Sequence, residues 1–463
     1  MVFSSLTFLF YFLPVVLILY YIVPKKFKNL ILFISSLVFY FIGEPKYGIV
    51  MIISILSTYL HGIFMDKYKK HKKKFLVSAI VISLLFLIYF KYTDFIIENI
   101  NTIFNGTFDL LNLTLPIGIS FYTFKMISYI VDVYNDKVKV QKNFLNLATY
   151  VSLFPQLMAG PIVRYSTIEN ELENRNHTFS GFSNGVMRFI IGLAKKVLIA
   201  DVLSDLIGNF NSCTEKTVLF YWIYAIATTL QIYFDFSGYS DMAIGLGKMF
   251  GFNFPENFNY PYISKSITEF WRRWHMTLGT WFRDYVYIPL GGNRVGKIKW
   301  LRNILIVWIL TGLWHGAAWN FILWGLLYGI LLMIEKLGLL KILDKLPSFL
   351  SRTYVMFITL VGFILFSGVG VNEILENLGG LFGIGTSSLV NKESIYYLIS
   401  YALVLIIAII ASTPILKNIF LKLKEKVPKV INILEPIVLS ILLIICTSYL
   451  VDGSFNPFLY FRF

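Results

Sequence analysis

Runs of about 20 apolar residues recur along the whole chain, and short polar or basic stretches separate them. A segment of this length is needed to cross a hydrocarbon layer of roughly 30 Å. Lipid offers no partner for backbone polar groups, so such segments must be helical. The pattern therefore predicts an all-α polytopic membrane protein.

We expect about 11 to 13 membrane helices, including re-entrant elements. The run at 217–250 is too long for a single crossing, which leaves one or two elements there. Segment 262–290 is polar and aromatic, and it predicts a re-entrant or interfacial element. With no internal repeat or soluble domain in the pattern, we expect a single membrane domain over 1–463. The predicted spans are 3–23, 28–43, 47–65, 75–91, 113–132, 144–163, 183–207, 217–250, 303–314, 318–335, 353–371, 394–412 and 432–451.

Composition agrees with this class. Hydrophobic residues make up 57% of the chain and charged residues 14%, whereas soluble domains are about a quarter charged. The net charge of +15 does not indicate nucleic acid, because the lysines cluster in short loops between apolar runs. Membrane lipids with anionic headgroups are the expected partners of these loops. Cys213 and Cys446 match no metal or redox spacing.

Lysine and arginine clusters predict the topology. The cluster at 25–28 places the loop after the first apolar run inside, and therefore the N-terminus outside. That first run lacks a basic leader and a cleavage site, so we expect it to be retained. The C-terminal tail is also expected outside, as is the acidic-leaning loop 373–393. The further basic clusters, all expected on the cytoplasmic side, are 67–74, 294–302, 336–352 and 417–429.

Proline and glycine interrupt two of the predicted spans, at 115–118 and 154–161. Irregular backbone at membrane depth is tolerated where it is buried in protein or lines a cavity. The interruptions indicate a solvated interior path, with ordinary helix kinks as the alternative.

Of the five histidines, His315 is the strongest candidate for chemistry. It follows the apolar stretch 303–314, and about 12 helical residues above a basic loop would climb about 18 Å. The imidazole is then expected to be recessed in the membrane, where ionisable residues mark functional sites. Histidine also suits proton transfer near neutral pH. An interhelical hydrogen bond is the alternative role. His61, His71 and His177 are expected to be ordinary.

The second candidate histidine, His275, lies in the aromatic and basic segment 257–294. Such a segment suits a membrane interface. It equally suits an entry funnel for a phosphate-bearing donor, because arginine grips phosphate well. The funnel candidates are Arg272, Arg273, Arg283 and Asp284.

A polar island interrupts the apolar run at 231–241. Carboxylates at membrane depth need partners, and we expect Arg or Lys side chains from 272–294 to supply them. The residues expected to form this scaffold are Gln231, Asp235, Tyr239 and Asp241.

Several stretches together resemble the membrane-bound O-acyltransferase superfamily, in particular the branch that O-acetylates bacterial polysaccharides and is typified by the alginate O-acetyltransferase membrane proteins. They follow the family's order over essentially the whole chain. The stretches are Met1–Ser5, Phe154–Pro161, Phe234–Asp241, Phe270–Arg283, Trp314–Gly325 and Asn456–Phe463.

The resemblance implies a fold with a central tunnel and an acyl transfer to a hydroxyl by a histidine inside it. His315 matches that histidine, and His275 matches a second upstream position. It also implies a bacterial cell membrane location, no bound cofactor, and acetyl-CoA or another acyl thioester as the donor substrate. The acceptor would be a polysaccharide, reached with a separate extracytoplasmic acetyltransferase resembling serine hydrolases.

Chemistry sets further expectations for the site. An acyl transfer needs a base, donors for the developing oxyanion, and exclusion of water. His315 is expected as the base, with an acyl relay as the alternative. If the helix continues past Gly316, Trp319 shares the face of His315 and would orient its ring. Asn320 would reach the oxyanion only if the backbone breaks near Gly316.

Two other functions remain open at this level. One is the related transfer of D-alanine to teichoic acid. The other is a transporter without chemistry, which many broken spans would fit.

Overall fold

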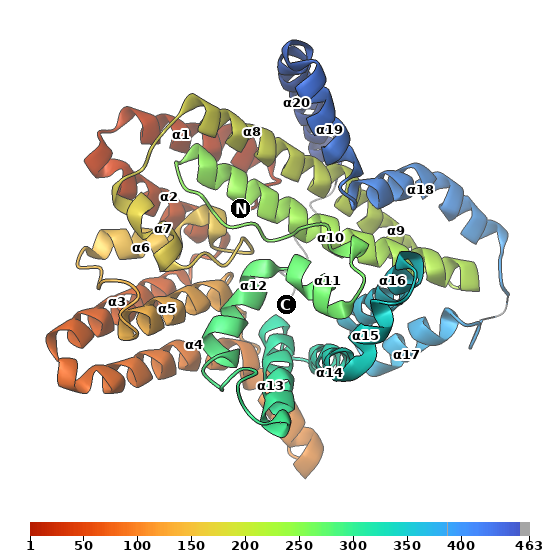
Figure 1. Ribbon diagram of the computed structural model, residues 1–463, viewed down its shortest axis with the longest axis horizontal. Coiled ribbons are helices and arrows are strands. Elements are labelled where there is room, and N and C mark those ends of the chain that lie inside the picture. The colour runs from red at the N-terminus through yellow and green to blue at the C-terminus, as the bar shows by residue number, and fades with distance from the viewer. Residues whose placement is uncertain (387, 454–463) are drawn as a thin grey trace. The chain divides into compact units, whose positions relative to one another are not determined.

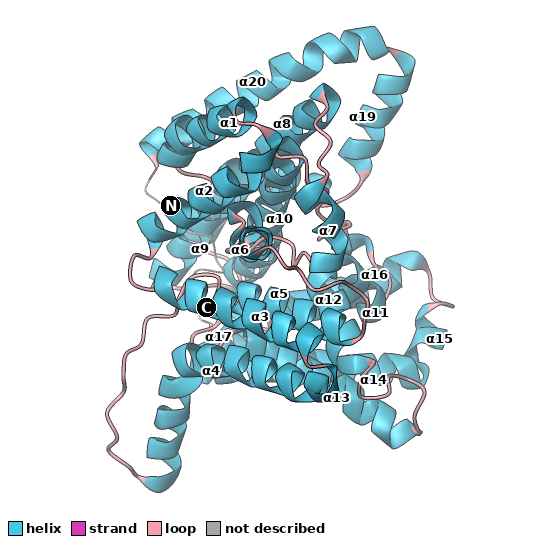
Figure 2. Cartoon of the chain, turned by 90° about the vertical axis from the view of Figure 1, so that its left-hand side faces the viewer, coloured by secondary structure: helices cyan, strands magenta, loops and turns pink. Residues whose placement is uncertain are grey.

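The computed structural model describes residues 1–386 and 388–453, and every regular element in them is a helix (Figure 2). The predicted all-α membrane class is confirmed. Six helical segments are long and apolar enough to cross a membrane on their own, and a shorter apolar helix covers Phe8–Ile22. The six are Lys25–Gly43, Gly48–Lys67, Lys69–Phe104, Ser348–Ser367, Lys392–Ala411 and Pro428–Asp452.

Residue contacts divide the chain into two compact units. Unit 1 comprises Met1–Phe189 with Ser240–Pro255, and unit 2 comprises Ile190–Tyr239 with Glu256–Phe463. The prediction of one family domain over the entire chain stays a prediction.

The helices that lie entirely within unit 1 come from residues 1–173 (Figure 1). They are α1 (Leu13–Ile22), α2 (Lys28–Gly43), α3 (Gly48–Lys67), α4 (Lys72–Phe104), α5 (Ile119–Tyr134), α6 (Phe144–Ser152) and α7 (Tyr165–Glu173). Two of the predicted spans are shorter than expected. The span at 113–132 begins only at Ile119, after Pro116 and the left-handed Gly118. The span at 144–163 ends at Ser152, just before the turn at Pro155.

Two helices pass from one unit into the other, α8 (Phe179–Ala194) and α10 (Val218–Met249). The 217–250 run is therefore one uninterrupted helix. The helices approach closely because glycines face each other. A Cβ at Gly245 would lie 2.6 Å from the carbonyl oxygen of Gly185, and one at Gly238 would lie 2.8 Å from that of Gly192. Small residues at such positions let two backbones meet.

Unit 2 holds the remaining helices. They are α9 (Val202–Ser212), α11 (Ile267–Arg273), α12 (Met276–Phe282), α13 (Lys297–His315), α14 (Trp319–Ile334), α15 (Leu340–Leu343), α16 (Ser348–Ser367), α17 (Val371–Gly380), α18 (Lys392–Ala411), α19 (Ile415–Lys426) and α20 (Pro428–Asp452). The polar segment at 262–290 contains the two short helices α11 and α12. Its re-entrant or interfacial position stays a prediction. The resemblance to the family also used the tail Asn456–Phe463, which lies outside the described residues, as does the expected position of the C-terminus.

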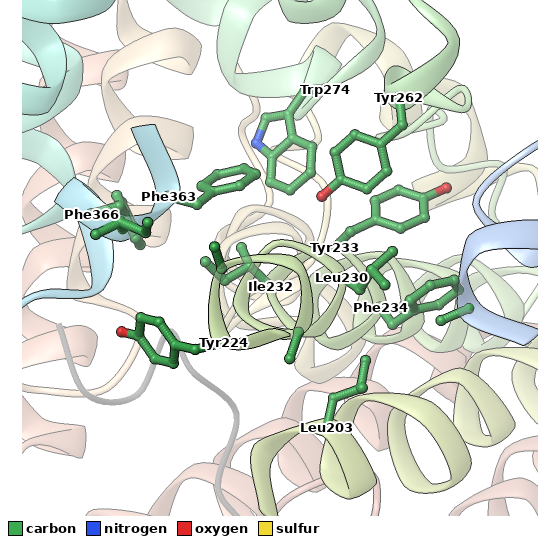
Figure 3. Packing of buried hydrophobic residues seen from close by; sticks show 14 of the residues in the cluster. Leu203, Tyr224, Leu230, Ile232, Tyr233, Phe234, Tyr262, Trp274, Phe363 and Phe366 are labelled. Carbon is green, nitrogen blue, oxygen red and sulfur yellow. The ribbon is translucent and has the colours of Figure 1, made fainter. Parts of the chain in front are cut away.

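The core of unit 2 is rich in aromatic side chains (Figure 3). Tyr233 on α10 lies 5.1 Å from the ring of Tyr262 and 6.0 Å from that of Trp274. Trp274 in turn lies 5.0 Å from Phe363 on α16. Aromatic pairs at these separations gain attraction beyond their buried area, so they hold α10, α16 and the region of α11 together.

Candidate active site

His315 is the last residue of α13, and the chain breaks immediately after it. Gly316 and Ala318 have extended backbones before α14 begins at Trp319. A Cβ at Gly316 would overlap the ring of Phe321, so a glycine is required where the chain turns between the two helices. The helix also begins at Lys297, six residues earlier than expected. Its basic residues therefore lie on its first turns rather than in a loop, and about 27 Å of helix separates Lys297 from His315.

The imidazole of His315 is 5% exposed and packs among aromatic rings. The ring of Trp324 on α14 lies 5.0 Å away, and that of Phe366 on α16 lies 5.1 Å away, both edge to face. The ring of the preceding residue, Trp314, also lies 5.0 Å away. These contacts fix the ring in a dry surrounding contributed by three helices.

The break after His315 decides the roles expected for the next residues. Trp319 is 56% exposed at the start of α14. The condition for its packing on the imidazole is not met, because the helix does not continue past Gly316. Trp324 packs on the imidazole instead. The condition set for Asn320 is met. Its amide is buried and donates to the carbonyl of Phe366 at 3.1 Å, beside the ring that contacts His315.

His275 lies between α11 and α12, in a left-handed conformation with φ 41°. Few residues other than glycine adopt this conformation, and it costs about 1–3 kcal/mol. Backbone hydrogen bonds to the segment 257–259 hold the turn in place. The amide of Asn259 donates to the carbonyl of Arg273 at 2.9 Å, and that of Met276 donates to the carbonyl of Asn257 at 2.9 Å.

A hydrogen bond to Asn257 determines which ring nitrogen of His275 carries the proton. Nδ1 lies 3.0 Å from Asn257 Oδ1, which also accepts from the backbone amide of Thr277 at 3.3 Å and its hydroxyl at 2.8 Å. A backbone amide only donates, so this atom of Asn257 is an acceptor. His275 Nδ1 must therefore donate, and the neutral ring keeps its lone pair on Nε2.

The Nε2 atom of His275 is buried, and no residue in the described part of the chain bonds to it. Buried polar atoms in proteins are almost always bonded, so this nitrogen is available to a hydroxyl or another donor. The ring lies 4.6 Å from that of Phe236 and 5.8 Å from that of Trp314. Trp314 thus links the two candidate histidines, and unit 2 brings both into one aromatic framework.

The sequence interpretation missed Glu335, a fully buried carboxylate at the end of α14. Its Oε1 accepts from the backbone amide of Ile267 at 2.6 Å, and its Oε2 accepts from the amide and hydroxyl of Thr268 at 2.8 and 2.7 Å. A carboxylate stabilises the first amides of a helix. Glu335 therefore anchors α11, which precedes His275.

The aromatic side chain of Trp271 transmits this anchoring to His315. Trp271 on α11 lies 4.8 Å from the ring of Tyr328, and 5.4 Å from that of Trp324. Trp324 is the residue that packs on His315. The signal for Glu335 in the sequence is a single carboxylate at the end of the otherwise apolar span 318–335.

The four funnel candidates differ in how far they are already engaged. Arg273 bonds Glu269 at 2.9 Å and the carbonyl of Asn259, and Arg283 bonds the adjacent Asp284 at 2.6 Å. Arg272 is exposed, and its positive charge interacts electrostatically with that of Lys336. Burial and Arg272 together hold the pKa of Lys336 below its usual value, against the opposing effect of Glu335. Arg272 and Lys336 are the cations best placed to receive an anion.

The scaffold carboxylates have other partners than expected. The ion pairs found are Asp235 with Lys196 at 2.7 Å, in unit 2, and Asp241 with Arg188 at 2.7 Å, in unit 1. The prediction that segment 272–294 supplies them is wrong, because α10 lies against α8 and the helix that follows it. Gln231 and Tyr239 are buried on α10.

A π-helical turn at Lys195–Asp201 brings a second carboxylate, that of Asp201, to the buried Lys196. Lys196 Nζ lies 2.8 Å from Asp201 Oδ1 as well as 2.7 Å from Asp235 Oδ1. Residues five apart lie on different faces of an α-helix but are bonded neighbours in a π-helix. The π turn therefore brings Asp201 to the same side as Lys196. Among residues 1–386 and 388–453, no group of three or more His, Cys, Asp or Glu side chains is arranged to hold a metal ion.

Comparison with known proteins identifies relatives over most of the chain. Residues 34–371 match the model of the MBOAT, membrane-bound O-acyltransferase, family. The chain is 40% identical over 421 residues to the protein named Probable alginate O-acetylase AlgI of Azotobacter vinelandii, covering 89% of this chain and 84% of that one.

Two further relatives have other acceptors in their names. The Peptidoglycan O-acetyltransferase of Helicobacter pylori is 35% identical over 438 residues, covering 86% of this chain and 83% of that protein. The Teichoic acid D-alanyltransferase of Bacillus subtilis is 33% identical over 234 residues, covering 48% of this chain and 59% of that protein.

The anchoring role of Glu335 predicts a measurable loss of stability. In Glu335→Gln, the amide nitrogen would face backbone donors, leaving one of them unsatisfied in a buried place. We expect a loss of about 2 kcal/mol, measured as a lower midpoint of thermal unfolding in detergent. Glu425→Gln, at an exposed position on α19, is the matched control. Equal midpoints for the two variants would contradict the role.

Proposed function

Because the chain belongs to the membrane-bound O-acyltransferase family, we propose that it transfers an acetyl group from cytoplasmic acetyl-CoA across the membrane, for O-acetylation of an exported or cell-wall polysaccharide. Membership makes the chain an O-acyltransferase-family enzyme, and the alternative of a transporter without chemistry is therefore wrong. The observation that carries the proposal is the placement of His315 and His275 in one buried aromatic framework.

The chemistry follows from the two rings. His315 accepts the proton of the acceptor hydroxyl as its oxygen attacks the thioester carbonyl. The carbon–sulfur bond then breaks, and the proton passes from His315 to the leaving thiolate. His275, with Nδ1 held by Asn257, offers Nε2 to a hydroxyl and so orients it. The surrounding aromatic side chains exclude water, which would otherwise compete as the acceptor.

Donors for the developing oxyanion are the remaining requirement. The Asn320 amide donates to the carbonyl of Phe366, whose ring lies 5.1 Å from that of His315. Only one of the two N–H bonds of the amide is needed for this carbonyl. Asn320 is our candidate for this role.

The donor is assigned to the face of unit 2 that carries Arg272 and Lys336. Acetyl-CoA bears several phosphates, and arginine and lysine bind phosphate through charge-assisted hydrogen bonds. The two cations lie at the ends of α11 and α14, the helices that support the candidate histidines. Neither bonds a carboxylate among the residues of this structure that are described.

The acceptor side is supported by the similarity to O-acetylating relatives. It extends over 86–89% of this chain for the alginate and peptidoglycan proteins, but over 48% for the D-alanyltransferase. This difference favours acetyl over D-alanyl transfer. The sequence carries no obvious serine nucleophile motif, which supports a separate extracytoplasmic serine-hydrolase-like partner. Both termini are assigned to the extracytoplasmic side on the basis of the lysine clusters.

Replacing His315 by alanine tests the base directly. In His315→Ala, polymer O-acetylation should fall about 10²–10⁴-fold, which is the usual contribution of acid–base catalysis. The acetyl content of the polysaccharide is measured in cells, with expression and membrane insertion checked by immunoblot. His61→Ala, on α3, is the matched histidine control. Wild-type acetylation in His315→Ala would exclude the assigned role.

Variants of the two free cations test the donor. Arg272→Gln and Lys336→Gln should each raise KM for acetyl-CoA about tenfold while kcat changes little, because a phosphate contact binds ground and transition states alike. Transfer of radiolabelled acetyl from acetyl-CoA is measured in proteoliposomes. The control is Lys345→Gln, exposed in the same basic stretch. A KM unchanged in both variants would place the donor elsewhere.

A further inference from the structure

A cluster of side chains in unit 1, two of them cations, lies outside the proposed acyl-transfer site. It comprises Tyr20, Lys28, Arg175 and His177, and we refer to it as the Tyr20 cluster. Lys28 Nζ lies 4.5 Å above the ring of Tyr20. The guanidinium of Arg175 lies 5.7 Å from the same ring and 4.6 Å from that of Phe252. Two cations thus share one aromatic ring, each attracted by its π face.

Hydrogen bonds fix the tyrosine at the centre. Its hydroxyl donates to the carbonyl of Phe250 at 2.7 Å, and His177 Nε2 lies 2.8 Å from the hydroxyl oxygen. A tyrosine has one proton to donate and a carbonyl can only accept. The proton therefore goes to Phe250, and His177 Nε2 must donate to Tyr20. His177, expected to be ordinary, is half-buried in its loop and serves as a fixed donor.

Positive charge at the cluster exceeds the negative charge available to it. The pKa of His177 is lowered by burial first, and then by the charges of Lys28, Arg175 and Lys25. The neighbouring carboxylate of Glu171 accepts from the amide and the side chain of Asn253, at 3.0 and 2.7 Å. In the described chain, neither Lys28 nor Arg175 has an ion pair with a carboxylate.

Arg175 also retains an unused donor. One nitrogen, Nη2, bonds the side-chain oxygen of Asn29. The other, Nη1, is buried and has no hydrogen-bond partner among the described residues. A buried guanidinium nitrogen without a partner is costly, and an anion with several acceptor oxygens would satisfy it while neutralising Lys28.

The surroundings of the cluster indicate what kind of anion it takes. The candidate span Lys25–Gly43 begins here, directly after the apolar helix that ends at Ile22. Such a position is at the level of the lipid headgroups. Close in sequence to the cluster, Ile22 and Phe179 are 75% and 89% exposed. Exposed apolar side chains close in sequence to a site with excess positive charge match a molecule with acyl chains and an anionic head.

We propose that the Tyr20 cluster binds the phosphate group of an anionic membrane phospholipid. Lys28 and Arg175 bind its oxygens, and the adjoining apolar side chains contact its acyl chains. This site is separate from the proposed acyl transfer, and a lipid-binding measurement tests it without any activity assay.

The full chain, purified in detergent, is titrated with phosphatidylglycerol or phosphatidylcholine, and bound lipid is counted by native mass spectrometry. We expect phosphatidylglycerol to bind about tenfold more tightly than phosphatidylcholine. Lys28→Gln should lower the phosphatidylglycerol affinity about fivefold or more, as expected for one cation at an anionic headgroup. The control, Lys70→Gln, removes an exposed lysine of the 67–74 cluster and should change it less than about twofold.

Arg175→Lys provides a second variant of the cluster. It keeps the charge but loses the planar fork, and it should weaken binding about threefold to tenfold. Equal binding of the two lipids, or unchanged phosphatidylglycerol binding in Lys28→Gln, would overturn the proposal. A third arm uses inorganic phosphate. Displacement of the lipid by millimolar phosphate would show that the site takes a soluble phosphate, and would also overturn it.

Discussion

The hydrogen bond from His275 to Asn257 is the interaction on which the account of the site depends. In an interior this apolar, a polar side chain is tolerated only with a fixed partner. Asn257 Oδ1 receives three donors at once, so it cannot turn without leaving them unsatisfied. The same constraint acts at Glu335, which holds the first amides of α11, and at Lys196, which holds two aspartates. Buried polar groups therefore set the positions of the helices in unit 2.

Aromatic side chains connect these fixed points to the candidate histidines. Trp271 on α11 packs against Trp324, and Trp324 packs against His315, so the position of α11 affects that of the His315 ring. Trp314 stands between His315 and His275. These large flat rings fill the space around the two histidines with apolar surface. Such a surrounding strengthens each remaining electrostatic interaction, which would favour the proposed acyl transfer.

The sequence predicted the helical class and the positions of most helices, because apolar length is visible in one dimension. The roles of His315 and His275 stay predictions. The sequence could not predict which partners meet. Asp235 was expected to pair with the basic segment near His275, but it pairs with Lys196, which a π-helical turn brings to that side. Trp319 was placed by assuming a continuous helix, whereas the chain breaks at Gly316. Asn257 bonds a residue 18 positions away, and Glu335 bonds residues 67 and 68 positions away. The periodicity of apolar residues does not predict contacts between such distant positions.

The most direct test of this account is the protonation of His275 in the intact protein. With ¹⁵N-labelled histidine, magnetic resonance distinguishes a ring nitrogen that bears a proton from one that does not, and a His275→Gln sample identifies the signals. The account predicts a neutral ring at pH 7.5 with the proton on Nδ1 and a bare Nε2, and loss of this preference in Asn257→Leu. A wild-type ring protonated on Nε2 would contradict it.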